Sequence, residues 1–189
     1  MLKYNLTKRI RAFQIAIISI TKKRRCKMTG KDRYKRTYPV SWDQLHKDSK
    51  ALAWRLIDTG QRWDKIIAVV RGGLVPAAII ARELDIHYVD TVCVSSYTLK
   101  EQGELKIIKS IEGLNGENAL IIDDLVDTGK TARIVRQMLP HAHFATVYAK
   151  PDGRPYIDTY VTEVSQDTWI LFPWDSEIQF IEPLIQQKP

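Results

Sequence analysis

Cysteine is scarce in this 189-residue chain, which contains only Cys26, in a basic run, and Cys93, in an apolar run. Two such separated cysteines provide neither a disulfide framework nor the paired spacing of a metal site. The apolar run at residues 12–20 has nine residues, whereas a helix that spans a membrane needs about 20. We therefore expect a protein of a reducing compartment, the cytoplasm.

Acidic residues are absent from residues 1–27, which hold nine Lys and Arg residues. Of the 29 basic residues in the chain, 20 remain from Met28 onward, against 22 acidic ones, so this longer part is slightly acidic. A nucleic-acid-binding protein needs its positive charge on the folded domain, and we therefore predict no nucleic-acid partner. The length and the hydrophobic content of 44% predict one globular domain with its own core.

The basic segment at residues 1–27 begins like a signal peptide but has no small-x-small cleavage site. Two interpretations stay open. We favour a dispensable extension upstream of a functional start at Met28. The alternative is an amphipathic anchor that contacts anionic lipid on the cytoplasmic face of the inner membrane. We place the domain boundary after a weakly structured or disordered extension, residues 1–35, so that the folded domain comprises residues 36–189.

Neither a G-x-G-x-x-G motif nor a P-loop occurs, because Asp124 stands where the P-loop requires its first glycine. The central motif is of another kind. Four apolar residues, 119–122, predict a strand that is buried on both faces and stops at the adjacent carboxylates Asp123 and Asp124. In the loop at residues 127–131, small and hydroxyl residues surround a glycine, a pattern that lets several backbone N–H groups converge on one anion.

A helix is predicted directly after this loop, because apolar residues then recur at helical spacing. These residues are Ala132, Val135, Met138 and Leu139. The positive end of the helix would face the same anion.

A second strand, loop and helix unit precedes the first. Residues 66–70 predict a buried strand that leads into Arg71, Gly72 and Gly73, where a guanidinium group and flexible backbone suit an oxyanion. A helix should begin near Pro76. Two such units predict an α/β fold with both anion sites at the carboxyl edge of a parallel sheet.

The remaining segments complete this plan. A helix capped by Ser41 should run to Asp58, and its predicted buried face consists of Trp42, Leu45, Leu52, Ala53, Leu56 and Ile57. Further strands are expected at residues 88–94, 144–151 and 160–164, followed by an irregular aromatic stretch at 166–175. The polar residues 95–109 predict either a solvated loop or hairpin, or a mobile lid over the site.

The stretch at residues 119–131 resembles the phosphoribosyl pyrophosphate (PRPP) signature of type I phosphoribosyltransferases. The runs at 147–155 and 167–175 are similar to those of the bacterial-type xanthine-guanine phosphoribosyltransferases, and the resemblance covers about residues 36–184. It implies the type I fold, which has a central, mainly parallel sheet flanked by helices, a small hood and a flexible loop after Ser95-Ser96-Tyr97. It also implies a homotetramer that transfers phosphoribose from PRPP to guanine, xanthine and, less well, hypoxanthine.

The resemblance assigns roles to particular residues. The 5′-phosphate of PRPP would bind the loop at 127–131, the ribose hydroxyls would bind Asp123 and Asp124, and Mg²⁺ would lie near Asp124. Catalysis would depend on Asp127, Asp123 and Asp124. The implied PRPP-binding residues are Arg71, Gly72, Gly103, Lys106, Asp123, Asp124, Leu125, Val126, Asp127, Thr128, Gly129, Lys130 and Thr131.

For the purine, the resemblance implies that Asp127 lies by N7 and that Lys150 donates to O6. Trp169 would stack on the base, and the backbone carbonyl of Ile170 would accept the 2-amino group of guanine. Two positions depart from the family pattern. Gly103 replaces an expected arginine, so that contact would pass to Lys100 or Lys106, and Leu171 replaces an expected acid, which leaves the order of preference among the three purines open.

Two other functions are compatible with parts of this pattern. A PRPP-sensing regulator would keep the fold without chemistry, but it would be expected to lose Asp127 or the base pocket. A phosphoribosyltransferase for adenine, orotate or uracil would differ at Lys150 and around Trp169.

In the family, the peptide bond after the position of Arg71 is often cis, and we expect the same here.

Overall fold

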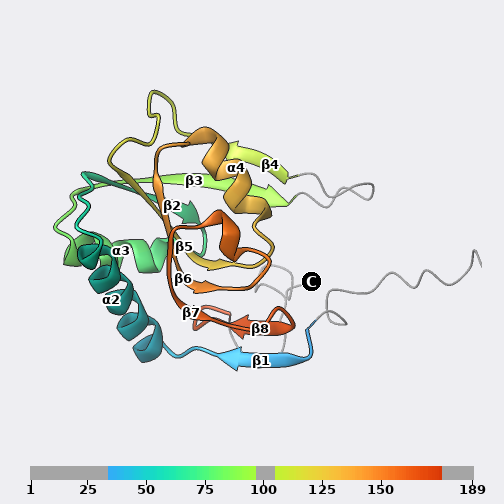
Figure 1. Cartoon of the computed structure of the whole chain (residues 1–189). Coiled ribbons are helices and arrows are strands. Elements are labelled where there is room, and N and C mark those ends of the chain that lie inside the picture. Colours follow the sequence, from blue (N-terminus) through green and yellow to red (C-terminus); the bar gives the residue numbers. More distant parts are fainter. Residues whose placement is uncertain (1–33, 97–104, 176–189) are drawn as a thin grey trace, which may run out of the picture. The chain divides into compact units, whose positions relative to one another are not determined.

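The computed structural model describes residues 34–96 and 105–175 (Figure 1). Its elements are, in chain order, β1 (Arg36–Pro39), α2 (Trp42–Asp58), β2 (Lys65–Val70), α3 (Leu74–Glu83), β3 (Tyr88–Ser96), β4 (Leu105–Lys109), β5 (Ala119–Val126), α4 (Lys130–Met138), β6 (His143–Ala149), the short 3-10 helix η2 (Arg154–Tyr156), β7 (Thr159–Glu163) and β8 (Thr168–Leu171). The predicted extension, residues 1–35, lies outside the described residues except for its last two. The boundary at residue 36 therefore stays a prediction.

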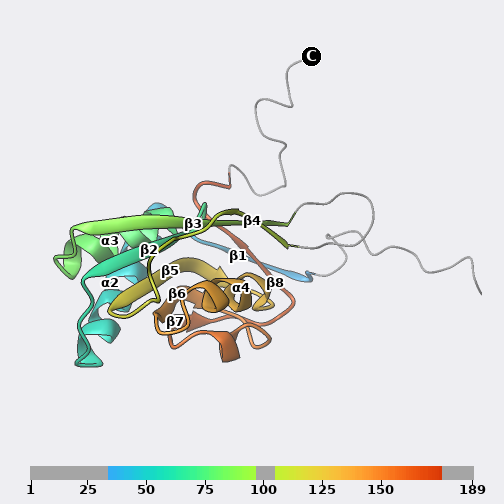
Figure 2. The ribbon, with the colours of Figure 1, turned by 90° about the horizontal axis from the view of Figure 1, so that it is seen from above.

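Six strands form one sheet in the order β4-β3-β2-β5-β6-β7 (Figures 1 and 2). Every neighbouring pair is parallel except β3 and β4. The predicted α/β fold with a mainly parallel sheet is confirmed. In the polar stretch at 95–109, β4 pairs with β3 as the second strand of a hairpin, and the segment between them, residues 97–104, lies outside the described residues.

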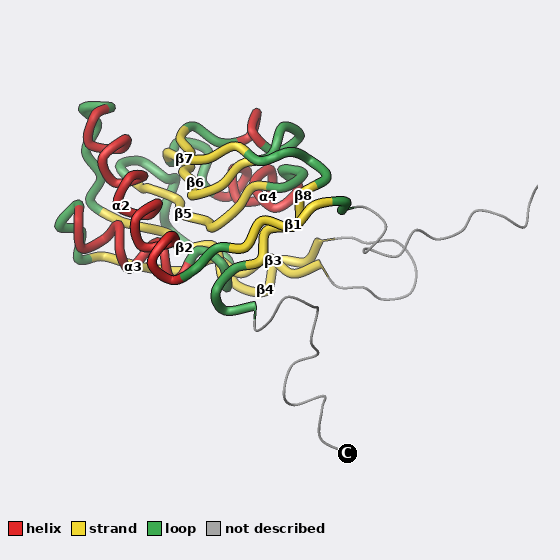
Figure 3. Tube along the Cα trace, turned by 90° about the horizontal axis from the view of Figure 1, so that it is seen from below, coloured by secondary structure: helices red, strands yellow, loops and turns green. Residues whose placement is uncertain are grey.

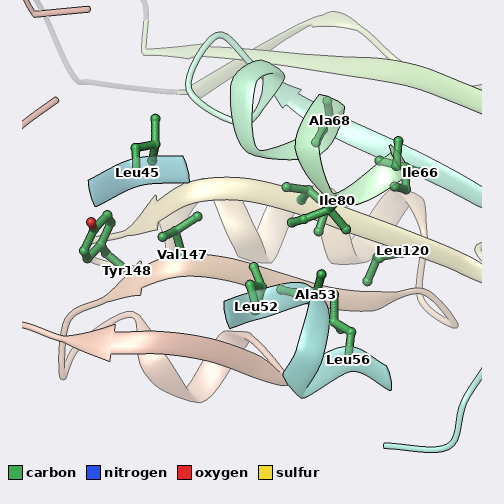
Figure 4. Close-up of a cluster of buried hydrophobic side chains, with 14 of the residues drawn as sticks. Leu45, Leu52, Ala53, Leu56, Ile66, Ala68, Ile80, Leu120, Val147 and Tyr148 are labelled. Carbon is green, nitrogen blue, oxygen red and sulfur yellow. The ribbon is translucent and has the colours of Figure 1, made fainter. Parts of the chain in front are cut away.

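Helices cover both faces of the sheet because successive side chains of a buried strand point to opposite faces. In β2, Ile66 and Ala68 pack with α2 and α3, whereas Ile67 and Val69 pack with α4. Figure 4 shows the first of these layers, in which Leu52 and Ile80 are among the helix side chains that lie against the strands.

Helix α2 begins as expected, because the Ser41 hydroxyl accepts a hydrogen bond of 3.1 Å from the Gln44 N–H group. Its predicted buried face is wrong at two residues. Trp42 is 56% exposed and leans edge-on against Trp174, and Ile57 is 47% exposed. Ile57 follows the buried Leu56 by one residue, which turns its side chain about 100° away around the helix axis.

The end of one strand also differs from the prediction. Strand β5 does not stop at the paired acids but continues to Val126, because β6 supplies backbone partners along this stretch, with Asp123 opposite Thr146. Helix α3 begins at Leu74, close to Pro76 as predicted.

Strands β1 and β8 form a separate two-stranded parallel sheet, which we call the hood (Figures 1 and 3). The predicted irregular stretch at 166–175 thus contains a short strand. The hood packs on the carboxyl end of β6, where the Tyr148 ring makes edge contacts with Tyr38 and Phe172. In the described part of the chain, no helix is both long and apolar enough to cross a membrane.

Candidate active site

The paired acids of β5 lie on opposite faces of the strand, so each one faces a different loop. Asp123 lines a hollow of about 120 Å³ together with the loop at 127–131. Asp124 lies against the loop that follows β2, where its carboxylate contacts the backbone of Gly72. One strand thereby presents a carboxylate to each of the two predicted anion sites.

The glycine pair after Arg71 has a packing role. A Cβ atom at Gly72 would lie 2.3 Å from the Asp124 carboxylate, and one at Gly73 would lie 2.3 Å from the Ile122 carbonyl oxygen. Both glycines therefore let the β2–α3 loop approach β5. Arg71 itself is exposed, and the cis peptide bond is Val70–Arg71, one residue earlier than expected.

Burial makes both strand acids hard to ionise. It raises the pKa of Asp123 well above its ordinary value, and the neighbouring charge of Asp124 raises it further. Burial also raises the pKa of Asp124 to about 6, although hydrogen bonds from Asp123 and the backbone oppose the shift. Such a pair favours a cation or hydroxyl donors as ligands, because either would stabilise the ionised carboxylates.

The loop at residues 127–131, which we call the phosphate-type loop, lies where α4 begins. The hollow beside it is lined by Asp123, Leu125, Val126, Asp127, Thr128, Gly129, Lys130, Thr131, Ala132 and Phe144. Gly129 has a φ of +73°, and a Cβ atom there would lie 2.0 Å from the Tyr156 ring. Only glycine fits this position, and the backbone N–H groups of the first helical turn border an anion-sized hollow.

Lys150 follows β6 and lies beside the same loop. Its backbone N–H donates to the Val126 carbonyl oxygen at 2.9 Å, and its Nζ atom lies 3.3 Å from Oδ1 of Asp127. The Lys150 side chain is 1% exposed, whereas that of Asp127 is 28% exposed. A cation that is nearly inaccessible thus lies next to a carboxylate that can still reach a ligand.

Trp169 and Ile170 are carried by β8 in the hood. Trp169 pairs with Thr37 of β1, and its side chain is 44% exposed, whereas Ile170 is buried in the core. The exposed ring suits a stacking surface. The hood segment is held near the loop because Gln166, three residues before Trp169, hydrogen-bonds to Asp127.

Two of the predicted PRPP contacts cannot be placed with the others. Gly103 lies outside the described residues. Lys106 belongs to β4, where its backbone pairs with Ser95, and its side chain lies outside the described part.

Three residues that shape the site were not predicted from the sequence. Gln166 contacts Asp127, Tyr156 packs against Gly129, and Gly153 lies where a Cβ atom would come within 2.8 Å of the Asp127 carbonyl oxygen. No periodic pattern or motif marks such long-range contacts. The only available signal was the proximity of Gln166 to Trp169 in the chain.

The fold and the site together define the class, an α/β protein with the type I phosphoribosyltransferase fold. Residues 41–181 match the family model of the phosphoribosyl transferase domain, and the chain belongs to this family. The predicted resemblance is thereby confirmed.

Among curated relatives, the chain is 65% identical to xanthine-guanine phosphoribosyltransferase of Nitratidesulfovibrio vulgaris, over 85% of this chain and 98% of that protein. It is 68% identical to the protein of the same name from Desulfotalea psychrophila, over 83% and 98%. Among solved structures, a purine phosphoribosyltransferase from Pyrococcus horikoshii shares 31% identity with a TM-score of 0.66, over 78% of this chain and 98% of that one.

Proposed function

We propose that this chain transfers the 5-phosphoribosyl group of PRPP to N9 of a 6-oxopurine and releases pyrophosphate. The substrates would be guanine and xanthine and, less well, hypoxanthine, and the products GMP, XMP and IMP, a reaction of purine salvage. The observation that carries the proposal is the buried Lys150 beside Asp127, directly next to the phosphate-type loop. The names of the relatives that are 65% and 68% identical support the same reaction.

PRPP would bind across the two loops. Its 5′-phosphate would occupy the hollow beside residues 127–131, where backbone N–H groups and the amino end of α4 favour an anion. Its ribose hydroxyls would donate to Asp123 and Asp124, since ionised carboxylates are pure acceptors. Arg71 and Gly72 would contact the pyrophosphate, to which a guanidinium group offers several donors.

The residues present fit a Mg²⁺ ion near Asp124. This carboxylate is hard to ionise alone because burial raises its pKa to about 6, and it lies at the edge of the pyrophosphate loop. Mg²⁺ prefers one or two carboxylates together with substrate phosphates. When bound, it would supply neutralisation of the leaving pyrophosphate.

In the reaction, the bond from C1′ of the ribose to the pyrophosphate oxygen breaks and the bond from C1′ to N9 forms. Asp127 would accept the proton that the base loses at N7. The Lys150 ammonium group would donate to O6, which selects 6-oxopurines, because the adenine amino group at that position is itself a donor. Trp169 would stack on the base, and the Ile170 carbonyl would accept the 2-amino group.

A purine panel tests this function. Pyrophosphate release is measured with PRPP, Mg²⁺ and each of guanine, xanthine, hypoxanthine and adenine. We expect turnover with the three 6-oxopurines and almost none with adenine. Brisk turnover of adenine would contradict the role of Lys150. A regulator without chemistry would bind PRPP and release no pyrophosphate with any base.

The assembly and the first segment are separate parts of the proposal. We infer a cytoplasmic homotetramer, which light scattering after size-exclusion chromatography would report as four times the 21.8-kDa chain mass. We also infer that residues 1–27 are dispensable. A chain that starts at Met28 should keep its activity and solubility, whereas binding of the full chain alone to anionic vesicles would favour a membrane anchor.

A further inference from the structure

Gln166 connects three segments of the candidate site through one side-chain amide. Its Nε2 atom donates to Oδ1 of Asp127 at 2.7 Å and lies 3.4 Å from the Asp127 carbonyl oxygen. Its Oε1 atom accepts a hydrogen bond of 3.0 Å from the Asp152 N–H group. The amide therefore joins the phosphate-type loop, the turn that follows Lys150, and the segment that leads to Trp169.

The orientation of this amide is determined by its partners. A backbone N–H group can only donate, so the atom that faces Asp152 must be the amide oxygen. The amide nitrogen is then directed at Asp127, and a carboxylate is an ideal acceptor for it. The contact with Asp152 thus keeps Gln166 in the orientation in which it donates.

One oxygen atom of the Asp127 carboxylate lies within reach of two donors, one cationic and one neutral. Oδ1 accepts from Gln166 at 2.7 Å and lies 3.3 Å from the Lys150 ammonium group. Two donors on one oxygen restrict rotation of the carboxylate. Gln166 is half-buried, so its hydrogen bond is partly protected from competing water.

We infer that Gln166 is a positioning residue for Asp127, and that it holds the Asp127 carboxylate in the orientation that receives the purine proton. The inference rests on the proposed function, in which Asp127 accepts that proton. It adds a coupling between the sites, because the segment that carries Trp169 is tied by Gln166 to the loop that binds the 5′-phosphate.

Two substitutions separate positioning from a merely structural role. Gln166→Glu keeps the size and the acceptor for the Asp152 N–H group but places a second carboxylate at Asp127. Gln166→Ala removes both contacts. If Gln166 only anchored the turn, Q166E would be the milder change. If it positions Asp127, Q166E should be at least as harmful as Q166A, because like charges oppose each other.

Steady-state pyrophosphate release with guanine is measured for Q166E and Q166A. The controls are the wild-type protein and a substitution of an exposed residue, Gln137→Ala. We expect kcat to fall roughly 10- to 100-fold in both Gln166 variants, as for partial loss of general acid–base catalysis, with KM for PRPP within about twofold of wild type. The ratio of Q166E to wild-type activity should rise as the pH falls towards about 5, because the new glutamic acid then becomes neutral. The corresponding ratio for Q166A should stay flat, and Q137A should match wild type.

The inference would be overturned if Q166E were as active as wild type. It would also be overturned if Q166A lowered kcat as much in an Asp127→Asn background as it does in the wild-type background. A wild-type chain that turns over no purine would instead count against the proposed function. Crystal structures of wild type and Q166A then decide the positioning role without an assay. We expect the Asp127 carboxylate to leave its wild-type orientation in Q166A, and an unchanged orientation would refute the inference.

Discussion

The Asp124 carboxylate lies so close to Gly72 that no side chain fits between them. A Cβ atom on Gly72 would be 2.3 Å from Cγ and Oδ2 of Asp124 and 2.4 Å from Oδ1. The two residues belong to different strand–loop units, β2–α3 and β5–α4, and their contact sets how closely the units approach. The loop after β2 and the acid Asp124 of β5 therefore approach each other at a point where only a glycine leaves enough room.

Gly72→Ala should disrupt this contact. We expect an unfolding free energy lower by about 1–3 kcal/mol, as for overpacking of a dense site, together with a strong loss of PRPP-dependent turnover. The check is a double-mutant cycle with Asp124→Ala, in which denaturant unfolding gives the free energy of each of the four proteins. The cost of G72A should shrink in the D124A background, because the carboxylate atoms in conflict are gone. An equal cost in both backgrounds would show that the conflict lies elsewhere.

Asp124→Asn should stabilise the ligand-free protein at neutral pH while abolishing turnover. The folded state raises the pKa of Asp124 from 3.8 to about 6 by burial, so it binds this proton more tightly than the unfolded chain. The stability of the native protein therefore falls as the pH rises from about 4 to about 6. An amide does not ionise and so avoids the cost of a buried charge. The unfolding free energy of the variant should therefore exceed that of wild type by on the order of 1–3 kcal/mol at pH 8, and by little at pH 4.

Urea unfolding at pH 4, 6 and 8 measures this difference. Asp43→Asn is the matched control, because Asp43 is exposed and pairs with Lys47 on the surface of α2. It should change the unfolding free energy by at most about 0.5 kcal/mol. A D124N protein that is less stable than wild type at pH 8 would mean that the Asp124 charge is already compensated within the protein.

Tyr148→Phe should destabilise the fold without changing the chemistry of the site. The Tyr148 hydroxyl donates to Oδ2 of the buried Asp48 at 2.5 Å, and Gln44 donates to Oδ1 at 2.8 Å. Removal of the hydroxyl takes one donor from a buried carboxylate, at a cost of about 1–3 kcal/mol.

Thermal unfolding compares this variant with Tyr160→Phe, in which the lost hydroxyl lies 3.4 Å from the exposed Glu163 carboxylate. We expect Y160F to cost less than about 0.5 kcal/mol, because water replaces the lost bond. We also expect kcat to stay close to wild type in both proteins. Equal costs for the two variants would argue that Asp48 finds another donor.

Much of the fold was predictable because its signals are local. The apolar run before Asp123 marks a buried strand, the loop around Gly129 marks the start of a helix, and the glycines after Arg71 mark a close approach of the backbone. All three features are present in the structure. Parallel strands joined by helices then follow from chain connectivity.

Other features depended on partners far away in the chain. The hood pairs Arg36 with Thr168, and neither short strand shows a pattern that reveals the other. The Ile57 side chain is exposed, although the apolar residue alone suggested burial. Strand β5 extends past its acids because β6 continues beside it, which a count of apolar residues does not detect.

The amino-acid sequence alone was sufficient for the family and for the two strand–loop–helix units, since each is encoded within a few consecutive residues. Only the folded chain showed that Asp123 and Asp124 face different loops, that Gly72 makes room for a carboxylate, and that Gln166 holds Asp127. Those relationships join residues 39 to 52 positions apart, or neighbours that the pleat of a strand separates. They arise from the packing of elements against one another, which no local stretch of sequence contains.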